Sequence, residues 1–521
     1  MKLRNIFYAA SLVIFCSCGD FLEPKSQSEY VPKDANALQE MLIGEAYPTQ
    51  TSTGVLSFLE IFSDDIQEQQ LEGYTFSDNH INSMEGLGAI FCWQPDMFTV
   101  ARQRGYGYSN VWAGLYKLLL GANAAIDYID DVSGTEEEKN YVVAQALGLR
   151  AFYYYLLVNY FGAPYNYNPQ ALGVPLKLDS GMREAENILM TRNTVGEIYD
   201  QIVKDLNEAE RLFLTLPEKQ QYQPDYMVSL PMIELLKSRI YLYMNNWAEA
   251  KKYAEKVIKD WNFTLIDLNG ISLPDPKQTN AYREFTNYQS PEVIWLYGNI
   301  TDLVAAHTSP YLTGTGSNNQ RRAFKASDRL LESFHADDLR KDLYIVRELK
   351  QDTKNPDNNE YYDTYLAFGK FMVTNSSPSS AGDYFALSFR VSEAYLNYAE
   401  ASAMNNAEAD AIKAMNSLLE NRYTNPESYA DLSTLTGDAL IERIREERRK
   451  ELCFEGQRWF DLRRYGMPSF TRKWGELTYK LEEKDRSYTM PIPNEVLDKN
   501  MRLEQNPLAP KRSGSLSKVN K

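Results

Sequence analysis

The chain has 521 residues, of which 44% are hydrophobic and 24% are charged, and its formal net charge is −16. This composition is that of a folded protein with a large apolar core, which argues against a disordered chain. A surface this acidic repels phosphate backbones, so the charge also argues against nucleic acid as a ligand.

The N-terminus has the pattern of a lipoprotein export signal. Two basic residues lead into an apolar run at 6–15, which has the length of a signal-sequence core rather than of a membrane-spanning helix. Small Ser17 precedes Cys18, which suits cleavage and lipidation at that cysteine. We expect residues 1–17 to be removed and Cys18 to carry the lipid. An ordinary secretory signal is the alternative, and no later stretch is expected to span a bilayer.

Helical periodicity dominates the rest of the chain, because apolar residues recur at three-to-four spacing over long segments. The predicted helices cover residues 110–129, 136–161, 193–213, 231–243, 247–258, 392–403 and 407–419. The last four form two helical pairs, each of which turns at a Met-Asn-Asn sequence. Small and aromatic residues in these pairs resemble tetratricopeptide units, which bury their faces by stacking on one another.

Two long segments have a different character. Residues 45–107 and 261–390 are rich in Gly, Asn, Asp, Ser, Thr and Tyr, with only short β-like pieces. Long loops on a rigid frame usually carry function. We expect one mainly α domain over residues 18–521, divided into ligand loops at 45–107, helical pairs at about 110–260, an irregular insertion at about 261–390 and a helical region at 391–521.

Motifs for catalysis or metal binding are lacking. Only three histidines are present, and no zinc-protease motif or serine-hydrolase elbow occurs. Adjacent acidic residues such as Asp64-Asp65 and Asp337-Asp338 could serve a glycosidase, which uses two carboxyl groups. With 71 acidic residues such pairs arise by chance, so we interpret them as solvated surface. We expect no enzyme, no metal and no cofactor.

The remaining cysteines are Cys92 and Cys453, which lie far apart in the sequence. An oxidising compartment would allow them to pair. Two buried thiols are the favoured interpretation.

The segment 443–465, RIREERRKELCFEGQRWFDLRRY, combines many charges with buried-type residues. We expect a helix hairpin in which Glu442, Arg445, Glu446 and Arg449 pair at helical spacing. The apolar residues expected beside them in the core are Leu452, Phe454, Trp459, Phe460 and Leu462. This segment is predicted to be structural and not catalytic.

The same segment strongly resembles the C-terminal signature of the SusD/RagB family, the surface glycan-binding lipoproteins of polysaccharide-utilisation systems. The matching residues are Glu447, Arg448, Arg449, Glu451, Leu452, Phe454, Glu455, Gly456, Arg458, Trp459, Asp461, Leu462 and Arg464. Further segments similar to the family are 18–23, 149–164, 393–401, 491–493 and 505–507. Together they extend over nearly the whole chain.

The resemblance implies a helical fold built on tetratricopeptide-like pairs, in an outer-membrane lipoprotein exposed at the cell surface. It implies binding of an oligosaccharide without cleavage, and delivery to a SusC-like TonB-dependent transporter. Some relatives capture peptides, so a peptide-binding lid of a RagB-like importer is the alternative. A surface glycoside hydrolase and a pure interaction scaffold are further alternatives.

Ligand residues are predicted from the chemistry of sugar binding, in which aromatic faces stack on sugar rings while polar side chains bind the hydroxyls. The loop before residue 110 and the loop at 305–325 offer such groups. The candidates are Tyr74, Trp93, Asp96, Tyr311, Asn318 and Arg321. Three other tryptophans, Trp112, Trp295 and Trp459, are predicted to lie in the core.

Overall fold

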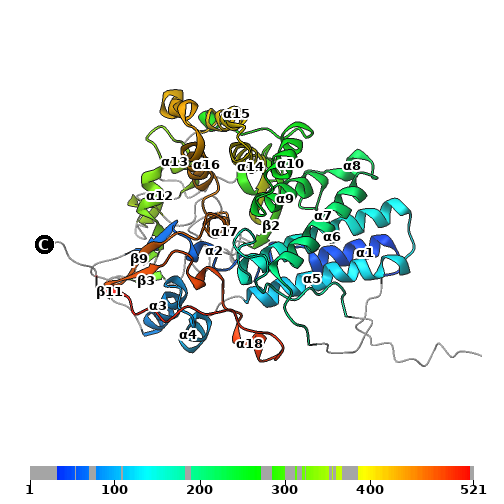
Figure 1. Cartoon of the computed structure of the whole chain (residues 1–521), viewed down its shortest axis with the longest axis horizontal. Helices are drawn as coiled ribbons and strands as arrows, with labels where there is room; N and C mark the ends of the chain where they lie inside the picture. Colours follow the sequence, from blue (N-terminus) through cyan, green and yellow to red (C-terminus); the bar gives the residue numbers. More distant parts are fainter. Residues whose placement is uncertain are drawn as a thin grey trace, which may run out of the picture.

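The computed structural model describes residues 32–52, 54–69, 78–106, 110–181, 189–271, 284–299, 311–313, 320–322, 324–345, 347–350, 355, 360–365 and 385–516. Helices predominate in these residues and the strands are short, which confirms the prediction of a mainly α fold (Figure 1). The predicted signal and Cys18 lie outside the described residues, as do Tyr74 and Asn318.

The N-terminal half is a layer of antiparallel helices around α6 (Glu136–Phe161). Helices α1 (Ala35–Ala46), α5 (Val111–Tyr128) and α7 (Val195–Phe213) pack against it. Thr135 and Thr194 begin α6 and α7 with capping boxes, in which a threonine and a glutamate satisfy the free N–H groups. The three predicted helices are confirmed, although the third begins at Val195 rather than at residue 193.

No segment after the signal was expected to be long and apolar enough to cross a membrane, but helix α6 is. However, 89% of its most apolar stretch is buried inside the protein. Its interior position is fixed by charge as well as by packing. Arg150 donates two hydrogen bonds, at 2.8 and 2.7 Å, to the carboxylate of Asp205 on α7. Both side chains are buried, so this pair orients the two helices and makes α6 a core helix.

The predicted helical pairs are present. Helix α9 (Leu230–Tyr243) pairs with α10 (Trp247–Lys259), and α14 (Val391–Met404) pairs with α15 (Glu408–Leu419). The turns rely on Asn245 and Asn406, each with φ of 59°, a left-handed conformation that asparagine tolerates. Helix α10 packs against α14, so the two pairs stack although they are far apart in the sequence (Figure 1).

Antiparallel strands join remote segments. Strand β2 (Val293–Asn299) pairs with β8 (Phe385–Arg390), and β1 (Ile66–Glu68) pairs with β5 (Phe324–Ala326). Strands β9 (Phe470–Trp474), β10 (Leu477–Leu481) and β11 (Ser515–Leu516) form a small sheet. Two further hairpins pair β3 (Tyr311–Thr313) with β4 (Gln320–Arg322), and β6 (Arg347–Lys350) with β7 (Glu360–Tyr365). Trp112, Trp295 and Trp459 are buried in the main core, as predicted.

Buried ion pairs surround the predicted hairpin, which consists of α16 (Gly437–Glu451) and α17 (Arg458–Arg464). We call the central group the arginine–carboxylate cluster, and its members are Glu292, Asp338, Arg340, Arg390, Arg422, Glu447, Glu451 and Glu455. Glu451 accepts from Arg422 at 2.9 Å and from Arg390 at 3.0 Å. The cluster therefore binds α16 to β8, to the turn after α15 and to α13 (Arg340–Tyr344).

Other charges of the hairpin reach different parts of the fold. Arg448 binds Asp461 at 2.9 Å, and Arg464 binds Glu400 of α14 through two hydrogen bonds of 2.7 Å. Arg445 pairs with Glu442 at 3.0 Å as predicted. Arg449 instead binds Asp65, which lies 384 residues away in the sequence. Ion pairs therefore also connect the hairpin to other segments of the chain. Helical spacing alone predicts only the pairs within the hairpin.

The connection between α16 and α17 is a tight buried turn. Phe454 and Gly456 have φ of 60° and 73°, and the Gly456 N–H donates to Glu60 at 2.6 Å. The predicted core residues Leu452, Phe454, Trp459, Phe460 and Leu462 are all buried. Cys92 and Cys453 are buried thiols that form no disulfide, as favoured from the sequence, and burial raises the pKa of Cys92 to about 12.

Removing one carboxylate charge should destabilise the protein strongly. Glu451→Gln leaves the buried Arg422 and Arg390 with less counter-charge, so we expect the free energy of unfolding to fall by about 3–5 kcal/mol. Urea denaturation followed by circular dichroism measures it. Glu255→Gln removes the same charge from an exposed pair with Lys259 and should cost less than about 0.5 kcal/mol. Equal losses in the two variants would contradict the account.

Acid should weaken the same cluster. Burial opposes ionisation of Glu447, but Lys450 and Arg340 outweigh it and lower the pKa from 4.5 to about 2. The stability that this shift contributes is present above the unfolded-state pKa and is lost as the pH falls toward 2. The free energy of unfolding of Glu447→Gln should therefore depend less on pH between about 4.5 and 2 than that of the unaltered protein. Parallel pH profiles would argue against the shift.

Candidate ligand-binding site

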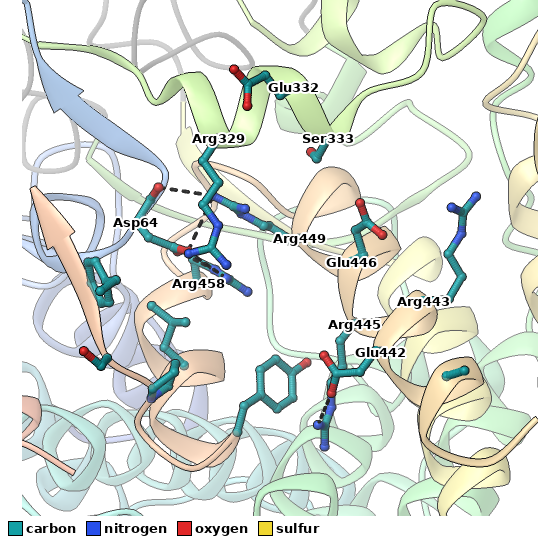
Figure 2. Close-up of a pocket in the computed structure, with 16 residues that line it drawn as sticks. Asp64, Arg329, Glu332, Ser333, Glu442, Arg443, Arg445, Glu446, Arg449 and Arg458 are labelled. Carbon is teal, nitrogen blue, oxygen red and sulfur yellow. Dashed lines mark hydrogen bonds and ion pairs between the residues drawn. The ribbon is translucent and has the colours of Figure 1, made fainter. Parts of the chain in front are cut away.

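Two adjoining hollows, of about 710 and about 750 Å³, form a continuous depression on one face of the protein. They share Asp64, Arg329 and Phe470. We call this depression the polar groove. Its walls come from β1, β5, β9, α16 and α12 (Asp328–Ser333), elements brought together from both ends of the chain (Figure 2).

Backbone and hydroxyl hydrogen bonds fix the junction between β1 and α12. The Ser327 N–H donates to the Asp65 carbonyl at 2.7 Å, and the Ser327 hydroxyl donates to the Asp64 carbonyl at 2.7 Å. The same hydroxyl accepts from the Leu330 N–H and caps α12. One side chain therefore joins the start of α12 to the acidic pair before β1.

Asp64 is the charged centre of the groove. Arg458 donates to its two carboxylate oxygens at 2.7 and 3.0 Å, and Figure 2 shows Arg329 and Arg449 converging on it as well. Burial opposes ionisation of Asp64, but Arg458 and Arg449 outweigh it and lower the pKa of the carboxyl group. Asp64 therefore stays ionised at neutral pH, and its charge holds the three guanidinium groups in place.

Arg329 differs from its neighbours because its side chain is 68% exposed. Its nearest carboxylate oxygen, on Asp64, is 3.6 Å away, which is an ion pair but not a hydrogen bond. A guanidinium group carries five N–H donors in a planar fork, so Arg329 can offer several to a ligand in the groove.

The opposite wall combines charge with aromatic rings. Helix α16 carries Glu442, Arg443, Arg445 and Glu446 along the groove (Figure 2). The Arg445 guanidinium lies 4.2 Å from the centre of the Tyr465 ring. Tyr465 and the half-buried Phe470 supply ring surface next to these polar groups. Alternating donors, acceptors and rings are the groups that bind hydroxyl-rich ligands.

Trp93 was predicted to stack on a ligand, and the structure places it elsewhere. It is completely buried, its indole N–H donates to the Phe62 carbonyl at 3.3 Å, and its ring packs between Phe470 and Arg472. A ring enclosed in this way has no free face, so the prediction for Trp93 is wrong. Its partners on β9, apolar Phe470 and cationic Arg472, enclose it in the core. The sequence around Trp93 does not reveal these contacts.

The other five predicted ligand residues lie either away from the polar groove or where their side chains are not described. Asp96 is partly exposed before α4 (Met97–Gln103), pairs with Lys511 at 3.1 Å and does not line the polar groove. Tyr311 and Arg321 belong to the β3–β4 hairpin, where Leu312 is opposite Arg321, and only their backbone is described. Tyr74 and Asn318 lie outside the described residues.

Described residues from the two regions chosen from the sequence line the groove. In the β1–β5 pair Glu68 is opposite Phe324, which defines one end of this ribbon. Gln69 and Lys325, at that end, line the polar groove. The expectation that both loops contribute ligand residues stays a prediction.

Sequence reasoning missed Asp64, Arg329 and Arg458. The pairs Asp64-Asp65 and Asp337-Asp338 were interpreted as solvated surface, which is wrong for three of the four side chains because Asp64, Asp65 and Asp338 are buried. Their arginine partners are mostly remote in the sequence. Among the described residues, no group of three or more His, Cys, Asp or Glu side chains is arranged to hold a metal ion.

Two protein-family models match the chain. Residues 277–508 match a model described as "SusD family", and residues 20–242 match one described as "Starch-binding associating with outer membrane". SusD-like protein P2 of Formosa agariphila is 26% identical over 438 residues, which cover 78% of this chain and 82% of that protein. SusD-like protein P25 of the same organism is 22% identical over 515 residues, 90% of each chain.

Solved structures share the fold. A putative sugar binding protein from Bacteroides vulgatus has a TM-score of 0.64 at 24% identity and covers 92% of this chain and 99% of its own. Surface glycan-binding protein A from Bacteroides uniformis has a TM-score of 0.62 at 20% identity and covers 90% and 99%. The two family models together take in most of the sequence, including the charged hairpin, and the chain therefore belongs to the SusD family.

Proposed function

We propose that this protein binds an oligosaccharide at the cell surface and delivers it to a SusC-like TonB-dependent transporter in the outer membrane, without cleaving it. The observation that carries the proposal is the polar groove along the β1–β5 ribbon, which both exposed Arg329 and half-buried Phe470 line. The description of the N-terminal family model as starch-binding supports the ligand class.

The chemistry of the groove suits a carbohydrate. Carboxylates of α16 accept hydrogen bonds from sugar hydroxyls, and Arg329 and Lys325 donate to hydroxyl and ring oxygens. The Phe470 ring offers apolar surface to the C–H face of a sugar. A volume of several hundred Å³ in each half is that of an ordinary ligand site.

The state of the acidic pair supports binding without hydrolysis. A general acid must keep its proton near neutral pH, whereas Asp64, which faces the groove, is held ionised by Arg458 and Arg449. Its neighbour Asp65 has a raised pKa because of burial, but it is completely enclosed and hydrogen-bonded to Arg449. Neither carboxyl group combines the protonation and the access that a glycosidase needs.

Lipidation at Cys18 accounts for the membrane attachment in this proposal. A lid over a transporter must stay beside it while it moves, and a lipid tether combined with protein contacts provides this restraint.

Arg329→Ala should lower the affinity for the recognised oligosaccharide by about tenfold, or about 1.4 kcal/mol, because it removes charged donors from the groove. Isothermal titration calorimetry against a panel of plant, algal and host oligosaccharides measures it. Lys259→Ala removes a similarly exposed cation from α10 and should have no effect. Binding of peptides with no glycan bound would contradict the ligand class, and an unchanged affinity in Arg329→Ala would contradict the site.

Cys18→Ala should leave the affinity of the purified soluble domain unchanged and impair growth on the recognised glycan, because the lid is no longer held at the membrane. Growth rates and uptake of a labelled oligosaccharide in cells carrying each form measure the effect. A variant protein that is exported and supports normal uptake would show that contacts with the transporter suffice.

A further inference from the structure

A second groove, of about 960 Å³, lies at one end of the α9–α10 pair. Four aromatic residues, Tyr222, Trp261, Phe263 and Tyr288, line it, and we call it the aromatic groove. It is formed by the connection between α7 and α9, which contains α8 (Glu218–Gln221), the residues after α10 and the segment before β2. It shares no lining residue with the polar groove, and Figure 1 shows α8 at the opposite side of the view from α12 and β9.

The rings of this groove are held in place before any ligand arrives. The Tyr222 ring meets Trp261 at 6.0 Å and Phe263 at 5.1 Å, both nearly edge to face. The Trp261 indole N–H donates to the buried carboxylate of Glu234 at 2.7 Å. The polar edge of Trp261 is therefore satisfied inside the protein, and binding to its ring costs little side-chain entropy.

Apolar surface at the groove is open to solvent. The side chains of Tyr288 and Leu214 are 49% and 58% exposed, and both line the groove. Exposed aromatic and aliphatic surface gathered around a hollow marks a place where another molecule binds.

The wall also contains an unused polar group. Ser290 is 5% exposed, lines the groove, and its hydroxyl makes no hydrogen bond with the described part of the protein. A buried hydroxyl without a partner is unfavourable, so a ligand hydroxyl that gains access to its covered oxygen would satisfy it. The exposed amides of Asn262 and Gln289 stand beside it at the rim.

Charge restricts the ligand class. The wall carries the carboxylates of Glu218, Glu234 and Asp260. Lys256 is the one cation among the described lining residues, and it is paired with Glu210 and Glu234 at 2.8 Å each. An anionic chain of uronates or sulfates would meet uncompensated negative charge, whereas a neutral sugar would meet acceptors for its hydroxyls.

We propose that the aromatic groove is a second carbohydrate-binding site, which takes a neutral stretch of glycan with sugar rings against Tyr288 and Trp261 and a hydroxyl on Ser290. This inference rests on the proposed function, because it extends glycan binding to a separate surface. Two sites on one lid hold a long polysaccharide at two points, which raises the overall affinity for long chains above that for short ones.

The test is fluorine NMR of the protein labelled with 5-fluorotryptophan, in which the seven tryptophans give separate signals and Trp261→Phe identifies the signal of Trp261. Neutral oligosaccharides of glucose, xylose, mannose and galactose, and a sulfated galactan, are titrated in turn. We expect a neutral oligosaccharide to shift the Trp261 signal and the sulfated chain to leave it unchanged.

Tyr288→Ala should weaken the response of the Trp261 signal by about fivefold in affinity, and Tyr288→Phe should preserve it, because the ring face rather than the hydroxyl makes the contact. Tyr167→Ala is the matched control, since Tyr167 is 57% exposed and lies outside both grooves. Circular dichroism checks that each variant folds.

The outcomes separate the two proposals. Glycan binding in calorimetry with no change in the Trp261 signal overturns this inference and leaves the proposed function intact. No glycan binding by either method overturns both. A Trp261 signal that responds to a proline-rich peptide and to no glycan overturns the carbohydrate assignment of this groove.

Discussion

The buried arginine–carboxylate cluster is the interaction on which the rest of the structure depends. Arg340, Arg390 and Arg422 are fully buried, and each needs a carboxylate to offset the loss of water. Glu447 and Glu451, one turn apart on α16, provide those charges together with Glu292. Because such pairs are costly when broken and depend on geometry, they specify how α16 must sit against segments that come from elsewhere in the chain.

The same hairpin connects this cluster to the polar groove. Arg449 and Arg458 of the hairpin bind Asp65 and Asp64, respectively. These two aspartates directly precede β1. The charged residues of the hairpin thus hold remote segments of the chain together through ion pairs. They hold a surface on which Arg329, supplied by α12, is an exposed cation. Exposed residues of the polar groove can therefore change the ligand preference while these buried ion pairs remain.

Local patterns predicted the helices well. The periodicity of 136–161 depends on neighbours within a few turns, and α6 has the same bounds. The apolar character of the hairpin likewise predicted five buried side chains correctly. The family resemblance also gave the right fold, and the hairpin sequence on which it rests contains three members of the cluster, Glu447, Glu451 and Glu455.

The site was harder to predict because it is assembled from remote segments. Asp64 acquires its role only when Arg458 lies beside it, 394 residues further along the chain. Trp93 has the residue type of a sugar platform, but packing against β9 buries it. The aromatic groove also unites residues from three connections, and its rings have no shared sequence pattern. Spacing describes a helix face, whereas these grooves are defined by tertiary packing.

The most direct test of glycan binding at the polar groove is hydrogen–deuterium exchange of the full soluble chain with and without its oligosaccharide. Ligand contacts slow the exchange of nearby backbone amides. The account predicts slower exchange in peptides that contain residues 66–69 and 325–333 when the glycan is bound. Glycan binding that leaves the exchange of both segments unchanged would contradict it.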